Sequence, residues 1–253
     1  MLTQKRHQMI LELLEQKQSV TVAELTGLLD ASEATVRRDL NALHDQGLLR
    51  KVHGGATALR GAIALEEPDM PTKASLHVEE KRAIGAYAAT LVQDDDFVYI
   101  DAGTSTQQLV QHLAPTKASF VTNGIEHARL LLRRGLRTQL LGGVIKPTTE
   151  AITGAVALES LRRYNFSKCF MGTNGVDLRC GLTTPDPEEA ALKSEAMARS
   201  YLSFVLADKS KFGVVTPVTF SALERACLLT ETEPAPEYRR QTIIKVVKEG
   251  NAP

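Results

Sequence analysis

The sequence predicts an α/β protein in two parts, an N-terminal winged helix-turn-helix followed by a mostly parallel α/β domain. Residues 1–58 hold three amphipathic helical segments and a short β-ribbon pattern, whereas from residue 97 onward apolar strand-like runs alternate with helical segments. Between the two patterns, residues 59–76 lack periodicity and contain glycine and prolines, which is typical of an exposed linker. We therefore expect domains at residues 1–58 and 77–253, joined by a linker at residues 59–76.

The composition excludes several classes of protein. The 253 residues include 30 Lys and Arg and 30 Asp and Glu, so the formal charge is zero and any nucleic-acid site must be local. Three cysteines and six scattered histidines predict neither a disulfide framework nor a metal site. No apolar run has the length of a membrane span, and the N-terminus lacks the apolar segment of a signal peptide, so we expect a cytoplasmic protein.

Residues 32–46 predict a helix with both ends marked. Ser32 can cap the first backbone amides, and Glu33 places negative charge in the first turn. Gly47 suits the left-handed backbone conformation that commonly ends a helix. Apolar residues recur along one side, at Val36, Leu40 and Leu43. The opposite side carries small and polar residues and an arginine, at Ala34, Arg38, Asn41 and Asp45, with Thr35 and Arg37 on its flanks. Such a face suits reading of the DNA major groove, although a surface helix with two solvated arginines would give the same pattern.

The neighbouring segments favour the DNA-binding interpretation. Residues 3–17 predict a first helix, Gln18-Ser19-Val20 a short link, and Thr21 to Glu24 a capping box that opens a second helix ending at Leu29. After the third helix, residues 48–56 predict a strand, a Gly54-Gly55 turn and a second strand, which is a wing. Its basic residues could contact phosphates or simply be solvated. The candidate DNA-binding residues are Thr21, Ser32, Glu33, Ala34, Thr35, Arg37, Arg38, Asn41, Arg50, Lys51, His53 and Gly54.

A resemblance to a known family rests on two long stretches in this region. Between Arg6 and Gly55 the chain reads Ser-Glu-Ala-Thr-Val-Arg-Arg-Asp-Leu and then Gly-Leu-Leu-Arg-Lys-Val-His-Gly-Gly-Ala. This resembles the winged helix-turn-helix signature of the DeoR family of bacterial sugar-operon repressors. The resemblance implies double-stranded operator DNA as a partner.

The C-terminal region predicts a parallel sheet with polar loops at one edge. A helix is expected at residues 77–92, with Glu79-Glu80-Lys81-Arg82 on its solvent-exposed side and Ile84 and Ala88 facing the core. Strands are expected at residues 97–100, 119–122, 138–141, 167–171, 203–207 and 243–247. Polar loops bearing glycine follow these strands, and in a parallel sheet such loops share the edge where ligands bind. The loop 101–106 offers backbone amides and side-chain hydroxyls at a helix N-terminus, which is a suitable binding site for phosphate.

Each candidate in these loops also has a plain structural explanation. Any one loop could be an ordinary strand-to-helix turn, and Lys81 lies in a charge run that would by default be solvated. Lys193 lies four residues after Glu189, so a solvated ion pair would explain both. Lys209 and Lys211 could add positive charge opposite Asp208. Neither a dinucleotide fingerprint nor a phosphate-binding loop of the nucleotide triphosphatases is present, and no cofactor is expected.

The resemblance to the DeoR family extends over this region. The matching pieces are Glu80-Lys81-Arg-Ala-Ile, Ile100-Asp101-Ala-Gly-Thr-Ser-Thr, Val121-Thr122-Asn123-Gly124, Gly142-Gly143, Gly172-Thr-Asn-Gly175, Glu188-Glu189-Ala-Ala-Leu-Lys193 and Ala207-Asp208-Lys-Ser-Lys211-Phe. The region is similar to the family's effector domain, whose fold resembles ribose-5-phosphate isomerase and glucosamine-6-phosphate deaminase. The resemblance implies a phosphorylated sugar as the ligand, and within the family the regulators of fructose and lactose phosphotransferase operons are most similar. Ala102 stands where a serine is common, which removes one possible hydroxyl contact.

The loops and the resemblance together give one set of candidate effector-binding residues. They are Lys81, Asp101, Gly103, Thr104, Ser105, Thr106, Thr122, Asn123, Gly124, Gly172, Asn174, Gly175, Glu189, Lys193, Asp208, Lys209 and Lys211.

Three functions are compatible with the sequence. The first is a transcriptional repressor, a homodimer or homotetramer, whose operator affinity changes when a sugar phosphate binds. The second is a sugar-phosphate isomerase or deaminase fused to a DNA-binding module, with Asp101, Glu188 or Asp208 as the base, although the spacing offers no convincing catalytic set. The third is a DNA-binding protein whose second domain only oligomerises.

Overall fold

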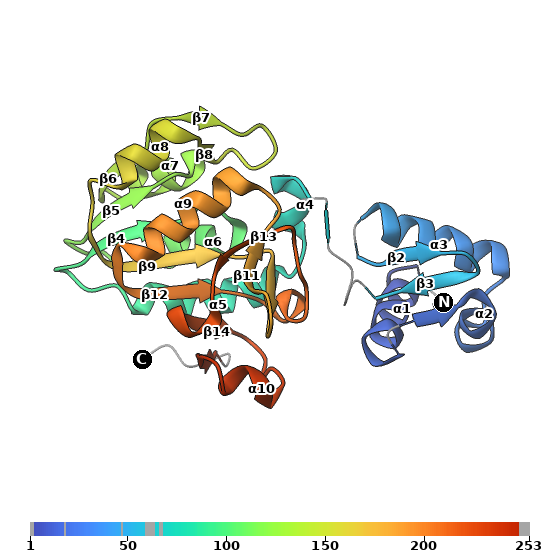
Figure 1. Ribbon diagram of the computed structural model, residues 1–253. Helices are drawn as coiled ribbons and strands as arrows, with labels where there is room; N and C mark the ends of the chain where they lie inside the picture. The colour runs from blue at the N-terminus through green and yellow to red at the C-terminus, as the bar shows by residue number, and fades with distance from the viewer. Residues whose placement is uncertain (1–2, 18, 47, 59–63, 66–67, 248–253) are drawn as a thin grey trace. The chain divides into compact units, whose positions relative to one another are not determined.

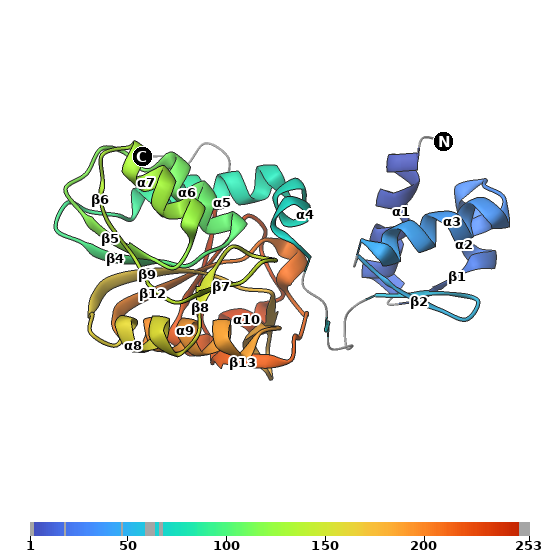
Figure 2. The ribbon, with the colours of Figure 1, turned by 90° about the horizontal axis from the view of Figure 1, so that it is seen from above.

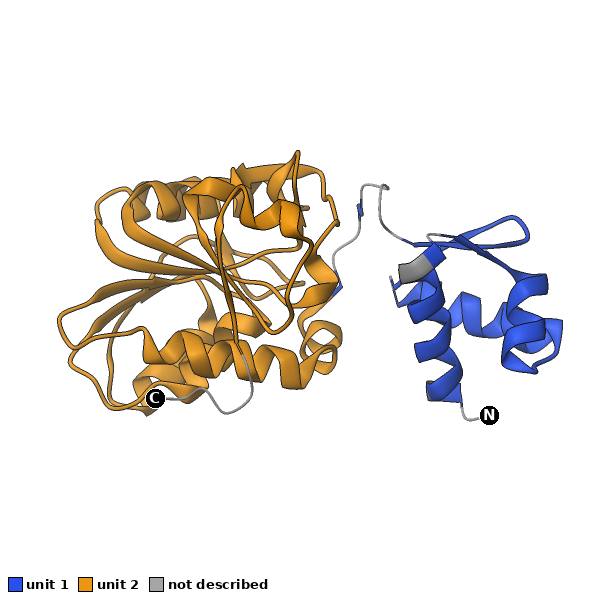
Figure 3. Cartoon of the chain, turned by 90° about the horizontal axis from the view of Figure 1, so that it is seen from below, with its two compact units in different colours: residues 1–68 blue, residues 69–253 orange. Residues whose placement is uncertain are grey.

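The computed structural model describes residues 3–17, 19–46, 48–58, 64–65 and 68–247, and the chain divides into two compact units. The N-terminal unit comprises residues 1–68 and the C-terminal unit residues 69–253 (Figure 3). Within the described residues, no helix is long and apolar enough to cross a membrane.

The N-terminal unit combines three helices with a three-stranded antiparallel sheet of order β1-β3-β2 (Figure 1). Its elements are α1 (Thr3–Lys17), β1 (Ser19–Thr21), α2 (Val22–Leu29), α3 (Glu33–Asp45), β2 (Arg50–Val52) and β3 (Gly55–Thr57). The capping box between Thr21 and Glu24 is confirmed, as is the cap of α3 by Ser32. The predicted stop at Gly47 lies outside the described residues. The winged helix-turn-helix fold is thus confirmed.

Two local predictions in this unit are wrong. The expected link at residues 18–20 contains strand β1, in which Val20 pairs with Ala56; Gln18 itself lies outside the described residues. The wing turn is His53-Gly54, and Gly55 already belongs to β3. A Cβ on Gly55 would lie 2.1 Å from the Val20 carbonyl oxygen, so glycine is needed there for close strand approach rather than for the turn. The positive φ of 80° falls on Gly54.

The predicted apolar stripe of α3 builds the core of the N-terminal unit. Val36, Leu40 and Leu43 are all buried. They pack in one cluster with buried residues from the other two helices, among them Ile10, Leu14, Leu25 and Leu29. The stripe therefore fixes which side of α3 faces inward, and the side that carries Arg38 and Asn41 is exposed.

Sequence periodicity gave no sign of a buried carboxylate on α3. Asp39 is buried and accepts hydrogen bonds from Arg6 Nε at 2.7 Å and Arg6 Nη2 at 3.0 Å, and His7 Nε2 lies 3.2 Å from it. Burial opposes ionisation of Asp39, but the hydrogen bonds from Arg6 and His7 outweigh it and lower its pKa. This bidentate ion pair between Arg6 and Asp39 links α1 to α3.

The C-terminal unit is built on a seven-stranded parallel sheet of order β15-β14-β12-β9-β4-β5-β6 (Figure 1). Its strands are β4 (Phe97–Ile100), β5 (Ser119–Thr122), β6 (Arg137–Leu140), β9 (Phe166–Gly172), β12 (Ser200–Leu206), β14 (Cys227–Thr230) and β15 (Ile243–Val246). The helices are α4 (Met70–Ser75), α5 (Val78–Thr90), α6 (Thr104–His112), α7 (Ile125–Arg133), α8 (Ala155–Leu161), α9 (Pro187–Ala198) and α10 (Pro236–Arg239), with short 3-10 turns η1 (Lys209–Lys211) and η2 (Leu223–Arg225).

Helices cover both faces of this sheet, as the prediction of a mostly parallel α/β domain requires. Helices α5, α6 and α7 lie on one face and α8 and α9 on the other (Figure 2). Alternate residues of β4 enter the two resulting cores, with Val98 and Ile100 on the side of α5 to α7 and Tyr99 on the other side. The fold class is therefore confirmed.

The sequence predicted six of these seven strands and missed β14. No α-helix separates β14 from β12, so the alternation of strand and helix is broken there. The small antiparallel sheet of β10 (Gly175–Asp177), β11 (Gly181–Thr184) and β13 (Val218–Ser221) was also missed, as was the hairpin of β7 (Val144–Ile145) and β8 (Ile152–Thr153).

The predicted linker at residues 59–76 requires correction at its C-terminal end. Residues 70–75 form α4, whose first turn is capped by the Asp69 carboxylate accepting from Thr72 N at 2.9 Å. Pro71 in that turn suits a helix start, although in the sequence it suggested irregular structure. Residues 59–63 and 66–67 lie outside the described residues.

Replacing Asp39 by asparagine should loosen the N-terminal unit, because a neutral amide cannot balance the Arg6 guanidinium. We expect the free energy of opening of α1 and α3, measured by hydrogen exchange on the full chain, to fall by about 2 kcal/mol. The contribution of Asp39 should be complete above about pH 4 and be lost as the pH falls through its lowered pKa. Asp45→Asn, on the exposed side of the same helix, is the control; equal protection in both variants would contradict the role of the pair.

Candidate functional site

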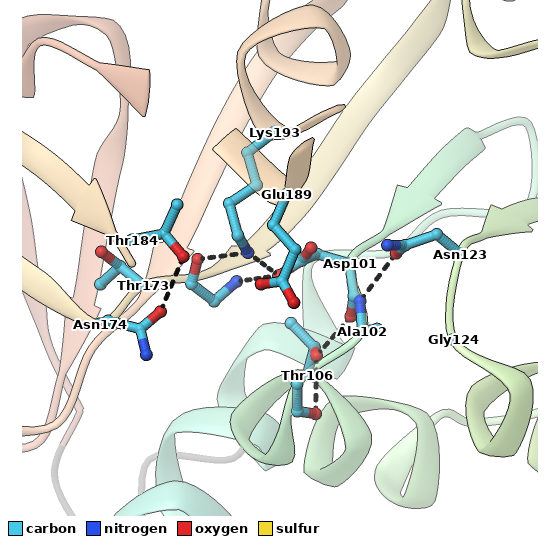
Figure 4. A network of polar contacts seen from close by, with 12 residues as sticks. Asp101, Ala102, Thr106, Asn123, Gly124, Thr173, Asn174, Thr184, Glu189 and Lys193 are labelled. Atoms are coloured by element: carbon cyan, nitrogen blue, oxygen red, sulfur yellow. Dashed lines mark hydrogen bonds and ion pairs between the residues drawn. The ribbon is translucent and has the colours of Figure 1, made fainter. Parts of the chain in front are cut away.

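The C-terminal ends of β4, β5 and β9 bring a network of polar side chains to one edge of the sheet (Figure 4). At its centre, Lys193 of α9 forms an ion pair with Asp101, the residue that follows β4. The exposed fraction of these residues is only 4% and 3%, respectively. Lys193 Nζ also donates to the Gly172 carbonyl at 3.1 Å, and Gly172 N donates to Asp101 Oδ2 at 3.0 Å. Three sequence-distant segments thus meet at one carboxylate.

The expected solvated ion pair between Lys193 and Glu189 is therefore wrong. Both residues are buried, and Lys193 points toward Asp101 (Figure 4). Glu189 accepts instead from Thr149 Oγ1 and from Lys146 Nζ, each at 3.0 Å. Helical spacing alone could not reveal this, because both partners come from distant segments. Glu188, one of the three candidate bases, accepts from the Thr153 hydroxyl at 2.9 Å.

Asn123 connects two loops of the site. Its Oδ1 accepts from Ala102 N at 2.9 Å, and its Nδ2 donates to the Ile152 carbonyl at 3.2 Å. Gly124 N donates to Thr122 Oγ1 at 3.0 Å, and a Cβ on Gly124 would lie 3.1 Å from the Ala102 Cβ. The loops after β4 and β5 therefore approach closely.

The N-terminus of α6 lies beside Asp101. Gly103 is its N-cap, and Thr104 and Ser105 have hydroxyls with no hydrogen-bond partner within the described residues. Thr106 points inward and donates to the Asp101 carbonyl at 2.6 Å. Thr104 and Ser105 can therefore serve a ligand, whereas Thr106 stabilises the loop.

The sequence gave no reason to single out His127, which lies beneath this loop. Its Nε2 is 3.1 Å from both Thr106 Oγ1 and the Gly103 carbonyl. Burial lowers the pKa of His127 to about 4, so the imidazole is neutral at pH 7. His127 therefore adds support but no positive charge.

A second group of charges surrounds Asp208, which follows β12. Lys81 of α5 is only 5% exposed, so the solvated position expected from its charge run is wrong. Burial lowers the pKa of Lys81 to about 8, helped by the charge of Lys211 and opposed by Asp208. Burial alone would raise the pKa of Asp208, but the charges of Lys211 and His77 outweigh it. Asp208 Oδ2 is buried with no hydrogen-bond partner within the described residues.

The remaining candidates lie at the rim or have structural roles. Lys209 is exposed, and its amide donates to Glu231 Oε1 at 3.1 Å. Asn174 Oδ1 accepts from the Thr184 hydroxyl at 3.1 Å (Figure 4). Gly175 lies in β10, where a Cβ would be 2.3 Å from the Val214 carbonyl oxygen. No group of metal-ligating side chains occurs in the described part of the chain.

The predicted DNA-contacting face of the N-terminal unit is exposed and partly engaged in internal bonds. Arg37 pairs with Glu33, its Nε 2.9 Å from Oε1. Lys51 of the wing donates to Asn41 Oδ1 at 2.6 Å, which joins the wing to α3. Arg38 is exposed and has no partner within the described residues. The other predicted residues are exposed (Ala34, Arg50, His53 and Gly54), partly buried (Thr35), or occupied in helix caps (Thr21 and Ser32).

Breaking the central ion pair from one side should be more damaging than removing both charges. Asp101→Asn leaves a buried ammonium without a counter-ion, and we expect urea unfolding of the C-terminal unit to show a loss of about 3 kcal/mol. The double variant Asp101→Asn/Lys193→Met should recover part of that loss. Asp95→Asn, an exposed carboxylate near β4, is the control. Additive losses in the double variant would contradict a direct interaction.

Comparison with known proteins covers nearly the whole chain. The DeoR-like helix-turn-helix domain matches residues 6–61, and the DeoR C-terminal sensor domain matches residues 76–231. The HTH-type transcriptional regulator FruR of Bacillus subtilis is 42% identical over 252 residues, 98% of this chain and 100% of that protein. A lactose phosphotransferase system repressor of Staphylococcus epidermidis is 33% identical over 81% of this chain and 82% of that protein.

Among solved structures, ribose 5-phosphate isomerase A of Methanocaldococcus jannaschii matches with a TM-score of 0.39 and 14% identity, covering 52% of this chain and 53% of that one. The two domain models match the N-terminal and the C-terminal unit in turn, and the match to FruR spans the whole length of that protein. The chain belongs to the DeoR family of DNA-binding transcriptional regulators.

Proposed function

We propose that this protein represses a sugar-utilisation operon and that a phosphorylated sugar, bound at the strand ends of the C-terminal unit, changes its affinity for operator DNA. The observation that carries the proposal is Lys81, a buried ammonium that no carboxylate of the described residues contacts directly. Burying such a charge is costly unless it serves a partner. An anionic ligand supplies that partner.

The phosphate would lie between Lys81, Lys211 and the N-terminus of α6. Lys81 and Lys211 are close enough for their charges to interact. The first amides of α6 and the hydroxyls of Thr104 and Ser105 add donors, which is the usual chemistry of a phosphate seat. The unpartnered oxygen of Asp208 would accept a hydrogen bond from a ligand hydroxyl.

The sugar would lie toward the Asp101–Lys193 pair. This pair carries no net charge, and together with Asn123 it offers both donors and acceptors, which suits hydroxyl groups. Asp101 already accepts from Lys193 and Gly172. A carboxylate held in this way is poorly placed to act as a free base, which favours binding over turnover.

On the DNA side, α3 would enter the major groove and the wing would contact phosphates. Arg38 is the exposed arginine best placed to read a base, and Asn41 and Lys51 lie beside it on α3 and the wing. Regulators of this kind bind two half-sites with two copies, so we propose a homo-oligomer. One relative is by name a lactose phosphotransferase system repressor, which supports a sugar transported by such a system.

The test is fluorescence anisotropy with DNA from upstream of the protein's own gene, at fixed salt, repeated with pentose and hexose monophosphates. Tight specific binding that one compound weakens would support the proposal. Specific binding that no sugar phosphate alters would refute the effector. No specific binding would refute the regulatory function, and a turnover assay on the same compounds would then test the isomerase or deaminase alternative.

Arg38→Ala should weaken operator binding about 10- to 100-fold, because a bidentate contact to a base edge contributes about 1–3 kcal/mol. Binding of the sugar phosphate, measured by calorimetry, should be unchanged. Arg82→Ala, an exposed arginine on α5, serves as the control for loss of one positive charge. Operator affinity equal to that of the control would show that Arg38 does not read DNA.

Effector affinity should fall above about pH 8, by up to tenfold per pH unit. Lys81 titrates near pH 8 in the free protein, amid the charges of Lys211, Asp208, Lys73 and Glu80, and must be protonated to bind an anion. Above that pH, binding has to include proton uptake. Calorimetry between about pH 7 and 9.5 would measure this. Lys81→Arg keeps its charge and should flatten the profile; the same steep fall in that variant would assign the titration to another group.

A further inference from the structure

Helix α4 is held in place differently from the other α-helices of the C-terminal unit. It is six residues long, and none of its described side chains is buried. It is also the first helix of the unit, since the boundary between the units falls between Pro68 and Asp69. A helix without buried side chains depends on polar contacts for its position.

One of these contacts joins the C-terminal end of α4 to the proposed phosphate seat. Lys81 Nζ donates to the Lys73 carbonyl, which also accepts from Leu76 N at 3.4 Å. The carbonyls at a helix C-terminus lack partners within the helix, so a lysine can satisfy them. The same ammonium lies within the electrostatic reach of Lys211 and Asp208. Lys81 therefore connects α4 to the charges of the site.

A second contact joins the N-terminal end of α4 to the other side of the site. Met70 N donates to the Thr148 carbonyl at 3.2 Å. Thr148 lies in the turn between β7 and β8, where Lys146 and Thr149 both donate to Glu189 of α9. Glu189 lies one helical turn before Lys193, the partner of Asp101. Both ends of α4 are thus attached to elements that form the site.

The residue that joins α4 to α5 has an unusual backbone conformation. His77, between α4 and α5, has a φ of 52°, in the left-handed region that residues other than glycine seldom adopt. Such conformations persist where surrounding contacts hold them, and they concentrate in segments that switch.

We propose that α4 reports the occupancy of the sugar-phosphate site, with Lys81 transferring its hydrogen bond from the Lys73 carbonyl to the bound anion. The ammonium has three N–H donors, so a bound anion does not displace the Lys73 carbonyl directly. Because hydrogen bonds to an anion are stronger than those to a neutral carbonyl, the anion draws the ammonium toward itself, and the hydrogen bond to the helix end is lost. The transfer loosens α4, which directly precedes the rest of the unit in the chain. The inference rests on the proposed function for the nature of the ligand.

The first test measures the attachment itself by hydrogen exchange on the full chain. Lys81→Gln should accelerate exchange of the α4 amides roughly tenfold, the effect of losing one charge-assisted hydrogen bond. Amides of β4 should keep their protection, and Arg82→Gln on the next residue should have no effect. Inorganic phosphate, compared with chloride at equal ionic strength, should accelerate α4 exchange in the wild type only. Unchanged α4 exchange in Lys81→Gln, or greater protection of α4 by phosphate, would overturn the proposal.

The second test leaves the binding residues intact. Met70→Pro removes the amide that donates to Thr148, at a first-turn position where proline is tolerated, and Met70→Leu is the matched control. Met70→Pro should alter affinity for the upstream DNA fragment at least fivefold while calorimetric binding of inorganic phosphate is unchanged. Equal DNA affinity in Met70→Pro and Met70→Leu would overturn transmission through α4. Absence of specific DNA binding by the wild type would instead refute the proposed function, and transmission with it.

Discussion

The buried ion pair between Asp101 and Lys193 organises the edge of the sheet on which the rest of the C-terminal unit depends. Asp101 follows β4, Lys193 comes from α9 on one face of the sheet, and Gly172 at the end of β9 bonds to both. Two charges in a dry interior are stable only when each is balanced and hydrogen-bonded. The pair thereby fixes the strand ends relative to α9, and the loop 101–106 and the turn 146–150 are positioned against that frame.

This constraint divides the site into a neutral and a charged part. Near β4 the charges of Asp101 and Lys193 cancel, whereas near β12 two lysines, Lys81 and Lys211, face Asp208. A ligand that matches both parts has hydroxyl groups at one end and negative charge at the other. His127 could have added positive charge beneath the α6 N-terminus, but burial keeps it neutral at pH 7.

What the sequence predicted and what it missed follow from the range of the interactions. Local signals succeeded: the Ser32 cap and the stripe of Val36, Leu40 and Leu43 depend on residues within a few positions, and the buried strands show as apolar runs. The sequence did not predict contacts between distant segments. The i, i+4 spacing paired Lys193 with Glu189, whereas its partner lies 92 residues away in sequence. Lys81 looked solvated because its hydrogen-bond partner, the Lys73 carbonyl, belongs to a helix that the sequence did not predict, and because the charges of Asp208 and Lys211 come from a distant segment.

The unequal burial of helices decides which element of the site can respond to a ligand. Six residues of α9 are buried, Lys193 among them, so displacing α9 would expose core side chains and break the central ion pair. Helix α4 has no buried side chain of its own, and displacing it exchanges hydrogen bonds at the Lys73 and Thr148 carbonyls. A ligand shifts an equilibrium only by its differential affinity for two arrangements, so the modest energy of a sugar phosphate moves the element whose two positions are nearly equal in energy. The difference in burial therefore favours α4 over α9 as the element that moves.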